Sequence, residues 1–214
     1  MDNKTNPLQA SYDRLAEKYA EIYFHELEHK PLDRELLNRL IHLVDGLGPI
    51  CDLGCGPGQI ARYLSDGGVD ALGVDLSGGM IKVAQRLSPH IEFKQGNMLS
   101  LDFDDNSLGG IAAFYSIIHI PHEAISDALL EMKRVLKLGG IVLISFHIGE
   151  EIMHLDELWG EQVDMDFIYF PVEEIESYIK AAAFEHLETV VREPYPDVEY
   201  QSRRGYIFAR RPHS

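Results

Sequence analysis

The chain has 214 residues, of which 45% are hydrophobic and 25% are charged. This balance is typical of a globular protein, and the length suits a single α/β domain. The formal net charge of −16 would repel a phosphate backbone, so we expect no nucleic-acid partner. No apolar run approaches the roughly 20 residues that span a bilayer, and residues 1–15 lack the apolar segment of a secretory signal. We therefore expect no membrane association and a cytoplasmic location.

The first elements in the chain are two predicted helices, over residues 6–23 and 31–47. Both place apolar residues at three- and four-residue spacing, and each has a proline in its first turn. Residues 48–54 then form a short apolar run bounded by glycines. Such a run is typical of a strand that is buried on both faces of a parallel sheet.

From there, predicted strands and helices alternate along the chain, which favours βαβ units and a parallel sheet with helices on both faces. The last two strands have no helix between them, so we expect them to pair as an antiparallel hairpin. The later strands are predicted over residues 69–76, 91–97, 108–118, 139–148, 186–195 and 203–211, and the later helices over residues 58–68, 77–88, 123–140 and 171–184.

These elements predict an α/β fold with a doubly wound, mostly parallel seven-stranded sheet, a C-terminal antiparallel hairpin and N-terminal helices. We expect a single domain over residues 1–214, in which residues 1–46 form a helical cap. Residues 150–170 are the least regular part of the pattern and are interpreted as a lid or substrate-binding insert. Trp159, with His154 and Phe167, would form an aromatic lid there or simply pack.

A glycine-rich turn follows the first strand. Gly54, Gly56 and Gly58 would let the backbone approach a ligand closely, because glycine has no Cβ atom. Asp75 ends the second strand beside this turn, where a carboxylate can accept hydrogen bonds from both hydroxyls of a ribose. A dinucleotide-binding protein would share these features, but the G-x-G-x-G spacing, with Asp52 two residues before the first glycine, differs from G-x-G-x-x-G.

The two cysteines lie at the end of this strand and inside the turn. Cys51 and Cys55 have no further cysteines with which to complete a zinc site. We therefore expect reduced thiols and no metal.

Three segments resemble motifs of a known family. Residues 50–64, ICDLGCGPGQIARYL, closely resemble motif I of the class I S-adenosylmethionine-dependent methyltransferases of the small-molecule type. Residues 72–85 look like the second motif, and residues 135–145 are similar to the segment that leads into the fifth strand. The resemblance implies S-adenosyl-L-methionine as cofactor and S-adenosyl-L-homocysteine as product.

The resemblance also implies roles for single residues. Asp75 would bind the ribose hydroxyls, and Leu76 and Met80 would flank the adenine, although core packing explains them equally well. Asn97 stands where the family often has Asp and would face the adenine amino group with its carbonyl, beside Met98. The remaining cofactor contacts are assigned to Tyr12, Tyr19, Asp52, Gly54, Cys55, Gly56, Gly58, Phe114 and Ser116.

Catalysis of methyl transfer depends mainly on orienting the acceptor in a closed, dry site. A hydroxyl or amine acceptor would also need a base. His119 and His147 are candidates because they follow the fourth and fifth strands at the carboxyl edge of the sheet, although a histidine there is often capped or exposed. Tyr19 is a third candidate, because the family's N-terminal segment brings a tyrosine near the methyl group. Its spacing of seven residues from Tyr12 also fits a packed helical face.

We therefore expect methyl transfer from S-adenosylmethionine to an O or N atom of a small molecule. Two alternatives stay open, namely a non-catalytic S-adenosylmethionine-binding protein and a nicotinamide-dependent oxidoreductase. The N/D-P-P-Y/F motif of enzymes that methylate nucleic-acid bases is absent after the fourth strand, where the chain has FYSIIHI. Arg192, Arg203 and Arg204 on the last strands would clamp an acidic substrate group or be solvated on edge strands.

Overall fold

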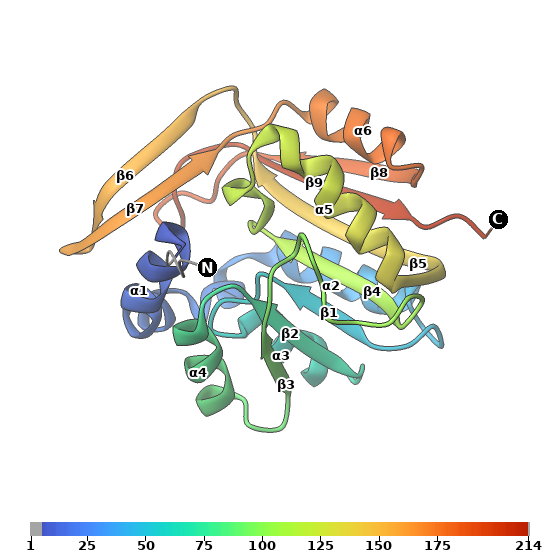
Figure 1. Ribbon diagram of the computed structural model, residues 1–214, viewed down its shortest axis with the longest axis horizontal. Helices are drawn as coiled ribbons and strands as arrows, with labels where there is room; N and C mark the ends of the chain where they lie inside the picture. The colour runs from blue at the N-terminus through green and yellow to red at the C-terminus, as the bar shows by residue number, and fades with distance from the viewer. Residues whose placement is uncertain (1–5, 214) are drawn as a thin grey trace, which may run out of the picture.

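The structure is a computed structural model that describes residues 6–213 (Figure 1). Its centre is a seven-stranded sheet with the strand order β3-β2-β1-β4-β5-β9-β8. Residues 1–5 of the expected N-terminal cap lie outside the described residues. The strands of the sheet are β1 (Ile50–Leu53), β2 (Ala71–Asp75), β3 (Glu92–Gln95), β4 (Leu108–Phe114), β5 (Leu136–His147), β8 (Glu185–Arg192) and β9 (Arg204–Arg210).

The sheet combines a parallel part with an antiparallel end. Neighbouring strands from β3 to β5 run parallel, whereas β9 lies antiparallel between β5 and β8. The central strands β1 and β4 are buried at every position, because helices cover both faces. The predicted doubly wound α/β fold and the predicted C-terminal hairpin are both confirmed.

Helices cover the two faces of the sheet, and the side chains of each strand alternate between them. In β4, Ile111 and Ala113 pack toward α5 and α6, whereas Ala112 and Phe114 pack toward α2 and α3. Because successive side chains of a strand point to opposite faces, an all-apolar strand supplies both cores at once. The helices are α1 (Pro7–Tyr23), α2 (Pro31–Leu43), α3 (Gln59–Asp66), α4 (Gly78–Leu87), α5 (His122–Val135) and α6 (Val172–Ala181), with short 3₁₀ turns at Glu26–His29 and Ile117–His119.

Helix α1 lies beside α4 and the strand β7 (Glu161–Ile168) (Figure 1). The side chain of Asn6 caps the first turn of α1, which begins at a proline. Asp13 of α1 accepts a hydrogen bond of 2.7 Å from the backbone N–H of Gly79 at the start of α4. Ser11 of α1 accepts one of 2.9 Å from the N–H of Asp164 in β7. Helix α1 is thus tied at two points to elements that are distant in sequence.

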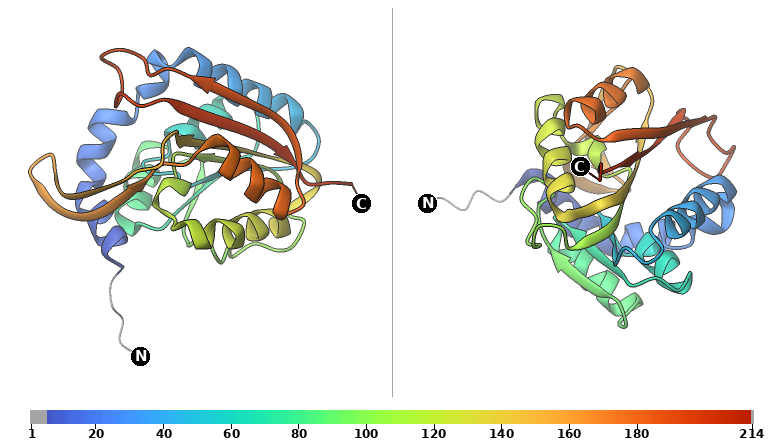
Figure 2. Two further views of the ribbon diagram at one scale, coloured as in Figure 1. Left: turned by 90° about the horizontal axis from the view of Figure 1, so that it is seen from above. Right: turned by 90° about the vertical axis from the view of Figure 1, so that its right-hand side faces the viewer.

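The expectation that residues 150–170 are irregular is wrong. This segment forms a two-stranded antiparallel ribbon of β6 (Ile152–Leu158) and β7 (Glu161–Ile168), which extends along α1 (Figure 2). Trp159 and Gly160 form the turn, with φ angles of 54° and 86°. Two positive φ angles in a two-residue loop match the right-handed twist of a hairpin. Because Trp rarely adopts a positive φ, the sequence showed no standard turn signal here.

Two predicted boundaries also differ from the structure. The predicted helix over 123–140 ends at Val135, because Leu136 already pairs with Leu108 of β4. The predicted strand over 108–118 ends at Phe114, since Tyr115 turns the chain with a φ of 49°. Both shifts occur at the ends of elements, where local sequence patterns are least informative.

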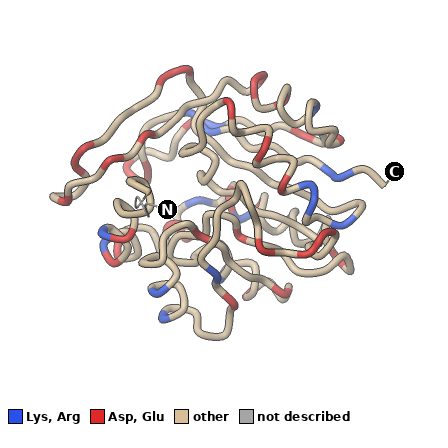
Figure 3. The backbone as a smooth tube through the Cα atoms, in the orientation of Figure 1, with Lys and Arg blue, Asp and Glu red and all other residues tan. Residues whose placement is uncertain are grey.

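Within residues 6–213, no helix has the length and apolar character needed to cross a membrane. Acidic residues are spread over the outer helices and along the β6–β7 ribbon (Figure 3). The negative charge is therefore a property of the surface as a whole.

Candidate active site

A cavity of about 670 Å³ lies at the carboxyl edge of the sheet. Its volume is within the range of small-molecule and cofactor sites. The wall around the glycine turn is called the glycine-loop half. The wall built from rings of α1, β5, the ribbon, the β8–β9 connection and the residues that directly follow β4 and β7 is called the aromatic half. The glycine-loop half comprises Gly54, Cys55, Gly56, Asp75, Asn97 and Ser116, and the aromatic half comprises Tyr23, Tyr115, His147, Trp159, Phe167, Tyr169 and Tyr200.

The glycine turn starts with a backbone position that only glycine fits. The N–H groups of Gly54 and Cys55 both donate to the carbonyl oxygen of Val74, at 2.7 and 3.0 Å, and so join the turn to β2. Gly54 has a φ of 78°, and a Cβ atom there would lie 2.3 Å from the Cβ of Ser116. The turn therefore packs directly against the end of β4.

The other two glycines of the turn differ in what they face. A Cβ at Gly56 would approach Tyr19 at 3.8 Å, so this backbone is open toward the cavity. Gly58 is not among the residues that line the cavity, and a Cβ there would lie 2.7 Å from the ring of Phe93 in β3. Gly58, the residue directly before α3, therefore packs against β3 behind the turn, and the cofactor contact predicted for it stays a prediction.

Asp52 connects β1 to the first turn of α3. Its side chain is almost fully buried and accepts a hydrogen bond of 2.9 Å from the N–H of Ala61. Burial raises the pKa of this carboxyl to about 8, even though the hydrogen bond favours the charged form. Asp52 therefore fixes the two ends of the glycine turn relative to each other, in addition to lining the cavity.

Asp75 also accepts hydrogen bonds from the chain. Its two oxygens accept from the N–H groups of Gly56 and Ser77, each at 2.8 Å. Burial raises its pKa to about 6, although both hydrogen bonds act in the opposite direction. Each carboxylate oxygen has a further lone pair, so Asp75 can still accept two ligand hydroxyls.

The residues predicted around the adenine also line the cavity. Asn97 Oδ1 accepts from the N–H of Leu99 at 2.9 Å, so the carbonyl already stabilises its own turn, and its second lone pair and the NH₂ group are left for a ligand. Met98 and Leu76 lie in the wall. Met80 lines the cavity and is 1% exposed because it also packs on α1, so core packing is confirmed for this residue and its adenine contact stays a prediction.

At the end of β4, the structure leaves polar atoms without partners. Phe114 lines the cavity with a ring that contacts Tyr206. Ser116 Oγ and Gln59 Oε1 are buried in the cavity wall and have no hydrogen-bond partner among the described residues. The other side-chain atom of Gln59, Nε2, donates to Glu26 at 3.0 Å. Buried oxygens without donors are costly, so this wall is suited to a ligand that carries N–H or O–H groups.

Tyr12 and His119 form a hydrogen-bonded pair in the cavity. His119 Nδ1 lies 2.7 Å from the carbonyl oxygen of Asp166, and Nε2 lies 2.6 Å from the hydroxyl of Tyr12. Because a carbonyl can only accept, Nδ1 carries the proton and Nε2 accepts from Tyr12. Burial lowers the pKa of His119 to about 4 and raises that of Tyr12 above its usual range. The imidazole is therefore neutral, with one accepting nitrogen.

Tyr19 lies about two turns beyond Tyr12 along α1. Its ring lies between the two halves of the cavity. Its ring is 6.2 Å from Tyr12, 4.7 Å from Tyr23 and 6.1 Å from Trp159, measured between centroids. Burial raises the pKa of Tyr19 well above its ordinary value, so the phenol stays protonated. Tyr12 and Tyr19 thus share one helical face, as their spacing predicts, and this face lines the cavity.

His147 lies in the aromatic half, at the end of β5. Its Nδ1 atom lies 2.7 Å from Ser202 Oγ and also contacts Arg204. Burial, assisted by the positive charge of Arg204, lowers the pKa of His147 to about 3. The predicted candidates His119 and His147 both line one cavity, each held by a different set of partners.

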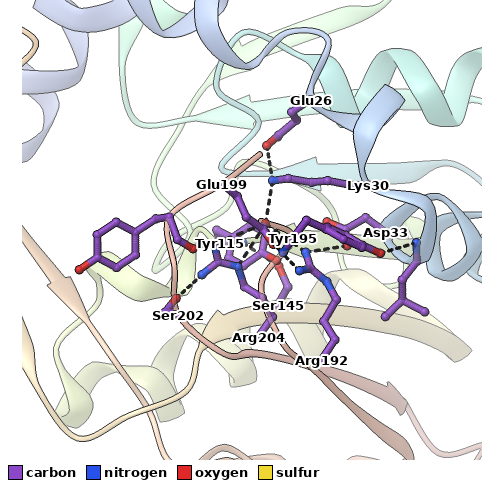
Figure 4. Close-up of polar contacts among 12 residues, drawn as sticks. Glu26, Lys30, Asp33, Tyr115, Ser145, Arg192, Tyr195, Glu199, Ser202 and Arg204 are labelled. Atoms are coloured by element: carbon purple, nitrogen blue, oxygen red, sulfur yellow. Dashed lines mark hydrogen bonds and ion pairs between the residues drawn. The ribbon is translucent and has the colours of Figure 1, made fainter. Parts of the chain in front are cut away.

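A buried network of charges supports the aromatic half (Figure 4). Glu199 pairs with Arg192, Arg204 and Lys30, and Arg192 also binds Asp33 at 3.1 Å. With the Lys30–Glu26 pair of 2.6 Å, three cations face three carboxylates. The network joins the start of α2 to the β8–β9 connection, and desolvated pairs of this kind are sensitive to the loss of one partner.

The network corrects the interpretation of the late arginines. The side chains of Arg192 and Arg204 are 8% and 3% exposed and bind carboxylates of the chain itself, so they are neither solvated nor free to clamp a substrate. Arg204 lies on β9, which is an internal strand of the sheet. Only Arg203 of the three is exposed, where it pairs with Glu193.

Comparisons with known proteins agree with this geometry. A family model described as a methyltransferase domain matches residues 50–140. The ubiquinone/menaquinone biosynthesis C-methyltransferase of Bartonella tribocorum is 30% identical over 182 residues, which cover 75% of this chain and 68% of that protein. This chain belongs to the S-adenosylmethionine-dependent methyltransferases.

Two further comparisons define how far the similarity to other methyltransferases extends. The demethylmenaquinone methyltransferase of Renibacterium salmoninarum is 28% identical over 151 residues, which cover 68% of this chain but only 60% of that protein. A crystal structure of a methyltransferase from Methanosarcina mazei has the same fold, with a TM-score of 0.72 and 19% identity, and the match covers 81% of this chain and 97% of the other.

The glycine-loop half fits the cofactor of this methyltransferase family, S-adenosylmethionine. Asp75 can accept the two ribose hydroxyls, and the orphaned oxygens of Ser116 and Gln59 can accept from the ammonium of the methionine part. The open backbone at Gly56 leaves room beside them.

Several residues of the methyltransferase cavity were indicated by no sequence pattern. Four such residues line it: Glu26 in the first 3₁₀ turn, Lys30 directly after that turn, and Glu199 and Tyr200 in the β8–β9 connection. The sequence held no signal that singles out Glu199, because Glu193 and Asp197 lie in the same connection.

Proposed function

We propose that this methyltransferase transfers the methyl group of S-adenosylmethionine to a small molecule held in the aromatic half of the cavity. The observation that carries the proposal is that both halves open into one cavity, so that a cofactor and an acceptor can meet there. When bound, S-adenosylmethionine supplies a methyl group that its sulfonium has already activated. The protein then has to bind and orient the acceptor and to remove its proton.

Cofactor binding is proposed for the residues of the glycine-loop half. Asp75 accepts the ribose hydroxyls, and Met98 supplies apolar contact to the adenine. The unpaired oxygens of Gln59 and Ser116 accept hydrogen bonds from the methionine ammonium. Tyr19, whose phenol stays protonated beside Gly56, donates to the methionine carboxylate.

Proton removal is proposed for the Tyr12–His119 pair. The Tyr12 hydroxyl takes the proton of the acceptor while its own proton passes to Nε2 of His119, across the hydrogen bond of 2.6 Å. The carbonyl of Asp166 keeps its hydrogen bond from Nδ1–H and stabilises the positive charge that develops on the ring. At neutral pH the imidazole is unprotonated, because its lowered pKa is about 4.

The acceptor atom is proposed from this relay. An O or N atom is the expectation from sequence, whereas the Bartonella relative is named a C-methyltransferase. O-, N- and C-methylation by this relay share one requirement. The acceptor atom must carry a proton that is acidic enough to be transferred to Tyr12. We therefore propose a small acceptor with an O–H, an N–H or an activated C–H group.

Calorimetry and methyl-transfer assays test this function. S-adenosylmethionine and S-adenosylhomocysteine should bind, and NAD should not. Binding without transfer of a radiolabelled methyl group to any member of a broad acceptor panel would favour the non-catalytic alternative, and absence of binding would refute both.

Replacing Tyr12 tests the relay separately. Tyr12→Phe should lower the methyl-transfer rate by roughly 10²- to 10⁴-fold, the usual contribution of general acid–base catalysis. The affinity for S-adenosylhomocysteine should change little. Tyr63→Phe, which removes a hydroxyl that binds Asn38 on the surface, is the matched control. An unchanged rate in Tyr12→Phe would contradict the relay.

A further inference from the structure

His147 is held in a fixed plane by two aromatic rings. Its centroid is 5.3 Å from that of Tyr115 and 5.2 Å from that of Tyr169, with interplanar angles of 35° and 33°. Tyr200 contacts the same ring at 6.4 Å and nearly at right angles. The imidazole therefore has little freedom to rotate, and its two nitrogens point in defined directions.

One of these nitrogens faces a guanidinium group. Nη1 of Arg204 contacts Nδ1 of His147, and Ser202 Oγ lies 2.7 Å from the same atom. A guanidinium has only donors, so Nδ1 must be the unprotonated nitrogen and Nε2 must carry the proton. Among residues 6–213, no hydrogen bond joins Nε2 to another group, and His147 lines the cavity.

Arg204 is itself held in place on every side. Nε pairs with Glu199 at 3.4 Å, Nη2 donates to the carbonyl of Tyr200 at 2.8 Å, and Nη1 contacts Ser202 as well as His147. Its plane also lies over the ring of Tyr115, 5.2 Å from the centroid. These contacts use the donors of Arg204 within the protein, so its effect on a ligand passes through His147.

The second histidine of the cavity has the opposite arrangement. His119 donates from Nδ1 to the carbonyl of Asp166 and accepts at Nε2 from Tyr12. His119, through Tyr12, can therefore accept a proton from a ligand in the cavity, whereas His147 presents an N–H donor to it.

We propose that Arg204 is a positioning residue that holds His147 as the Nε2–H tautomer, and that the methyl acceptor carries an oxygen that accepts this hydrogen bond. The second part rests on the proposed function, whereas the tautomer does not. His147 then determines specificity and is not the base. The acceptor presents an acidic X–H group to Tyr12 and a carbonyl or carboxylate oxygen to His147.

The rings beside the two histidines indicate the character of such an acceptor. Phe167 contacts the ring of His119 and Tyr169 contacts the ring of His147, so alternate positions of one segment face both histidines. The surrounding walls are aromatic, so planar hydroxy- or amino-aromatic carbonyl and carboxylate compounds are the class that fits.

Nuclear magnetic resonance of the ring nitrogens tests the tautomer in the wild-type protein without any ligand. Long-range ¹H–¹⁵N spectra should show a protonated Nε2 and a bare Nδ1 for His147, and the reverse for His119. Neither should titrate between roughly pH 5.5 and 8.5, since their pKa values are lowered to about 3 and about 4. For His147, Arg204, Lys30 and His119 act in this direction and Glu199 opposes them. A proton on Nδ1 of His147, or an imidazolium at pH 6, would overturn the proposal.

Variants test whether Arg204 selects the tautomer. Arg204→Met should allow the Nδ1–H form of His147 to appear, whereas the surface variant Arg203→Met should leave the spectrum unchanged. Ser202→Ala, which keeps the guanidinium, should keep the Nε2–H form and serves as the informative variant if Arg204→Met does not fold. A tautomer change in Ser202→Ala would assign the selection to the serine and refute the role of Arg204.

Benzoate and benzylamine test the oxygen preference on the protein saturated with S-adenosylhomocysteine. Benzoate should bind at least tenfold more tightly than benzylamine and should shift the Nε2–H resonance of His147. His147→Leu should abolish the preference, and His147→Gln, whose amide can donate, should restore part of it. Equal or tighter binding of benzylamine, or no response of His147 to benzoate, would refute the oxygen assignment. Failure of S-adenosylhomocysteine to bind would refute the proposed function and leave the tautomer result standing.

Discussion

The two halves of the cavity are built in different ways. The glycine-loop half consists largely of backbone, with positive φ angles at Gly54 and Gly56 and N–H groups bound to Val74 and Asp75. The aromatic half consists of side chains from α1, β5, the ribbon, the β8–β9 connection and the residues that directly follow β4 and β7, held by a buried charge network. A backbone site depends on the shape of one short segment, whereas a side-chain site depends on partners that are far apart in sequence. The halves should therefore fail in different ways when single residues are changed.

The largest effect is expected from breaking the charge network of the aromatic half. Arg192→Met would leave the buried carboxylate of Asp33 without its cation, and loss of one partner of a buried pair costs about 3–5 kcal/mol. The free energy of unfolding, measured with urea, should fall by about that amount. Arg203→Met removes an exposed pair and should cost less than about 1 kcal/mol. Equal losses in the two variants would show that the network does not support this half.

A smaller effect is expected from filling the space behind the glycine turn. Gly58→Ala places a Cβ atom against Phe93, and overpacking costs about 1–3 kcal/mol in addition to about 1 kcal/mol of left-handed strain. Gly68 has nearly the same φ, 88° against 87°, but open space around it, so Gly68→Ala should show the strain alone. Urea unfolding of both variants measures the difference. If the two variants lose equal stability, Phe93 does not constrain the turn.

Cofactor affinity should respond to pH through Asp75. Only the ionised carboxylate can accept from both ribose hydroxyls while bound to Gly56 and Ser77, and its pKa is raised to about 6. Binding of S-adenosylhomocysteine should therefore be full above this pH and should weaken by about tenfold per pH unit well below it. Asp75→Asn should bind about tenfold more weakly at pH 8 and should lack this pH dependence. Calorimetry between pH 4.5 and 8 measures these affinities. A constant wild-type affinity for S-adenosylhomocysteine over this range would contradict the ribose role.

At Asp52 the expected effect has the opposite sign, because it is a gain of stability. The folded-state pKa of about 8 lies above the ordinary value of 3.8, so the stability contribution is complete below pH 3.8 and is lost as pH rises through 8. Asp52→Asn keeps an oxygen for the N–H of Ala61 but cannot ionise. We expect it to be more stable than wild type at pH 9, where the buried Asp52 is ionised, and nearly equal to wild type at pH 4, where Asp52 is protonated. A loss at pH 9 would show that the charged form is tolerated.

The contrast between the halves also explains what the sequence could predict. The fold class followed from alternating apolar runs, and the glycine turn with Asp75 followed from a spacing within a short segment. Each of these signals is local, because a backbone site needs particular residues at adjacent positions. The spacing does not show, however, that the Cα of Gly58 faces Phe93 of β3.

The aromatic half required information that no short pattern holds. Lys30 meets Glu199, and Tyr12 meets His119, only because the sheet order and the path of α1 bring them together. The positive φ of Trp159 concealed the ribbon, because the turn uses a residue that rarely adopts that conformation. Tautomers were equally inaccessible, since they depend on whether a carbonyl or a guanidinium faces each ring nitrogen.

The β6–β7 ribbon has a consequence for how such enzymes diversify. Its strands pair with each other and not with the seven-stranded sheet, so its ladder of hydrogen bonds is self-contained. Residues 152–168 could be exchanged for a hairpin of another sequence without breaking a backbone pair of the cofactor-binding sheet. Because Trp159 and Phe167 belong to the ribbon, one such replacement would change part of the proposed acceptor pocket and keep the same methyl donor.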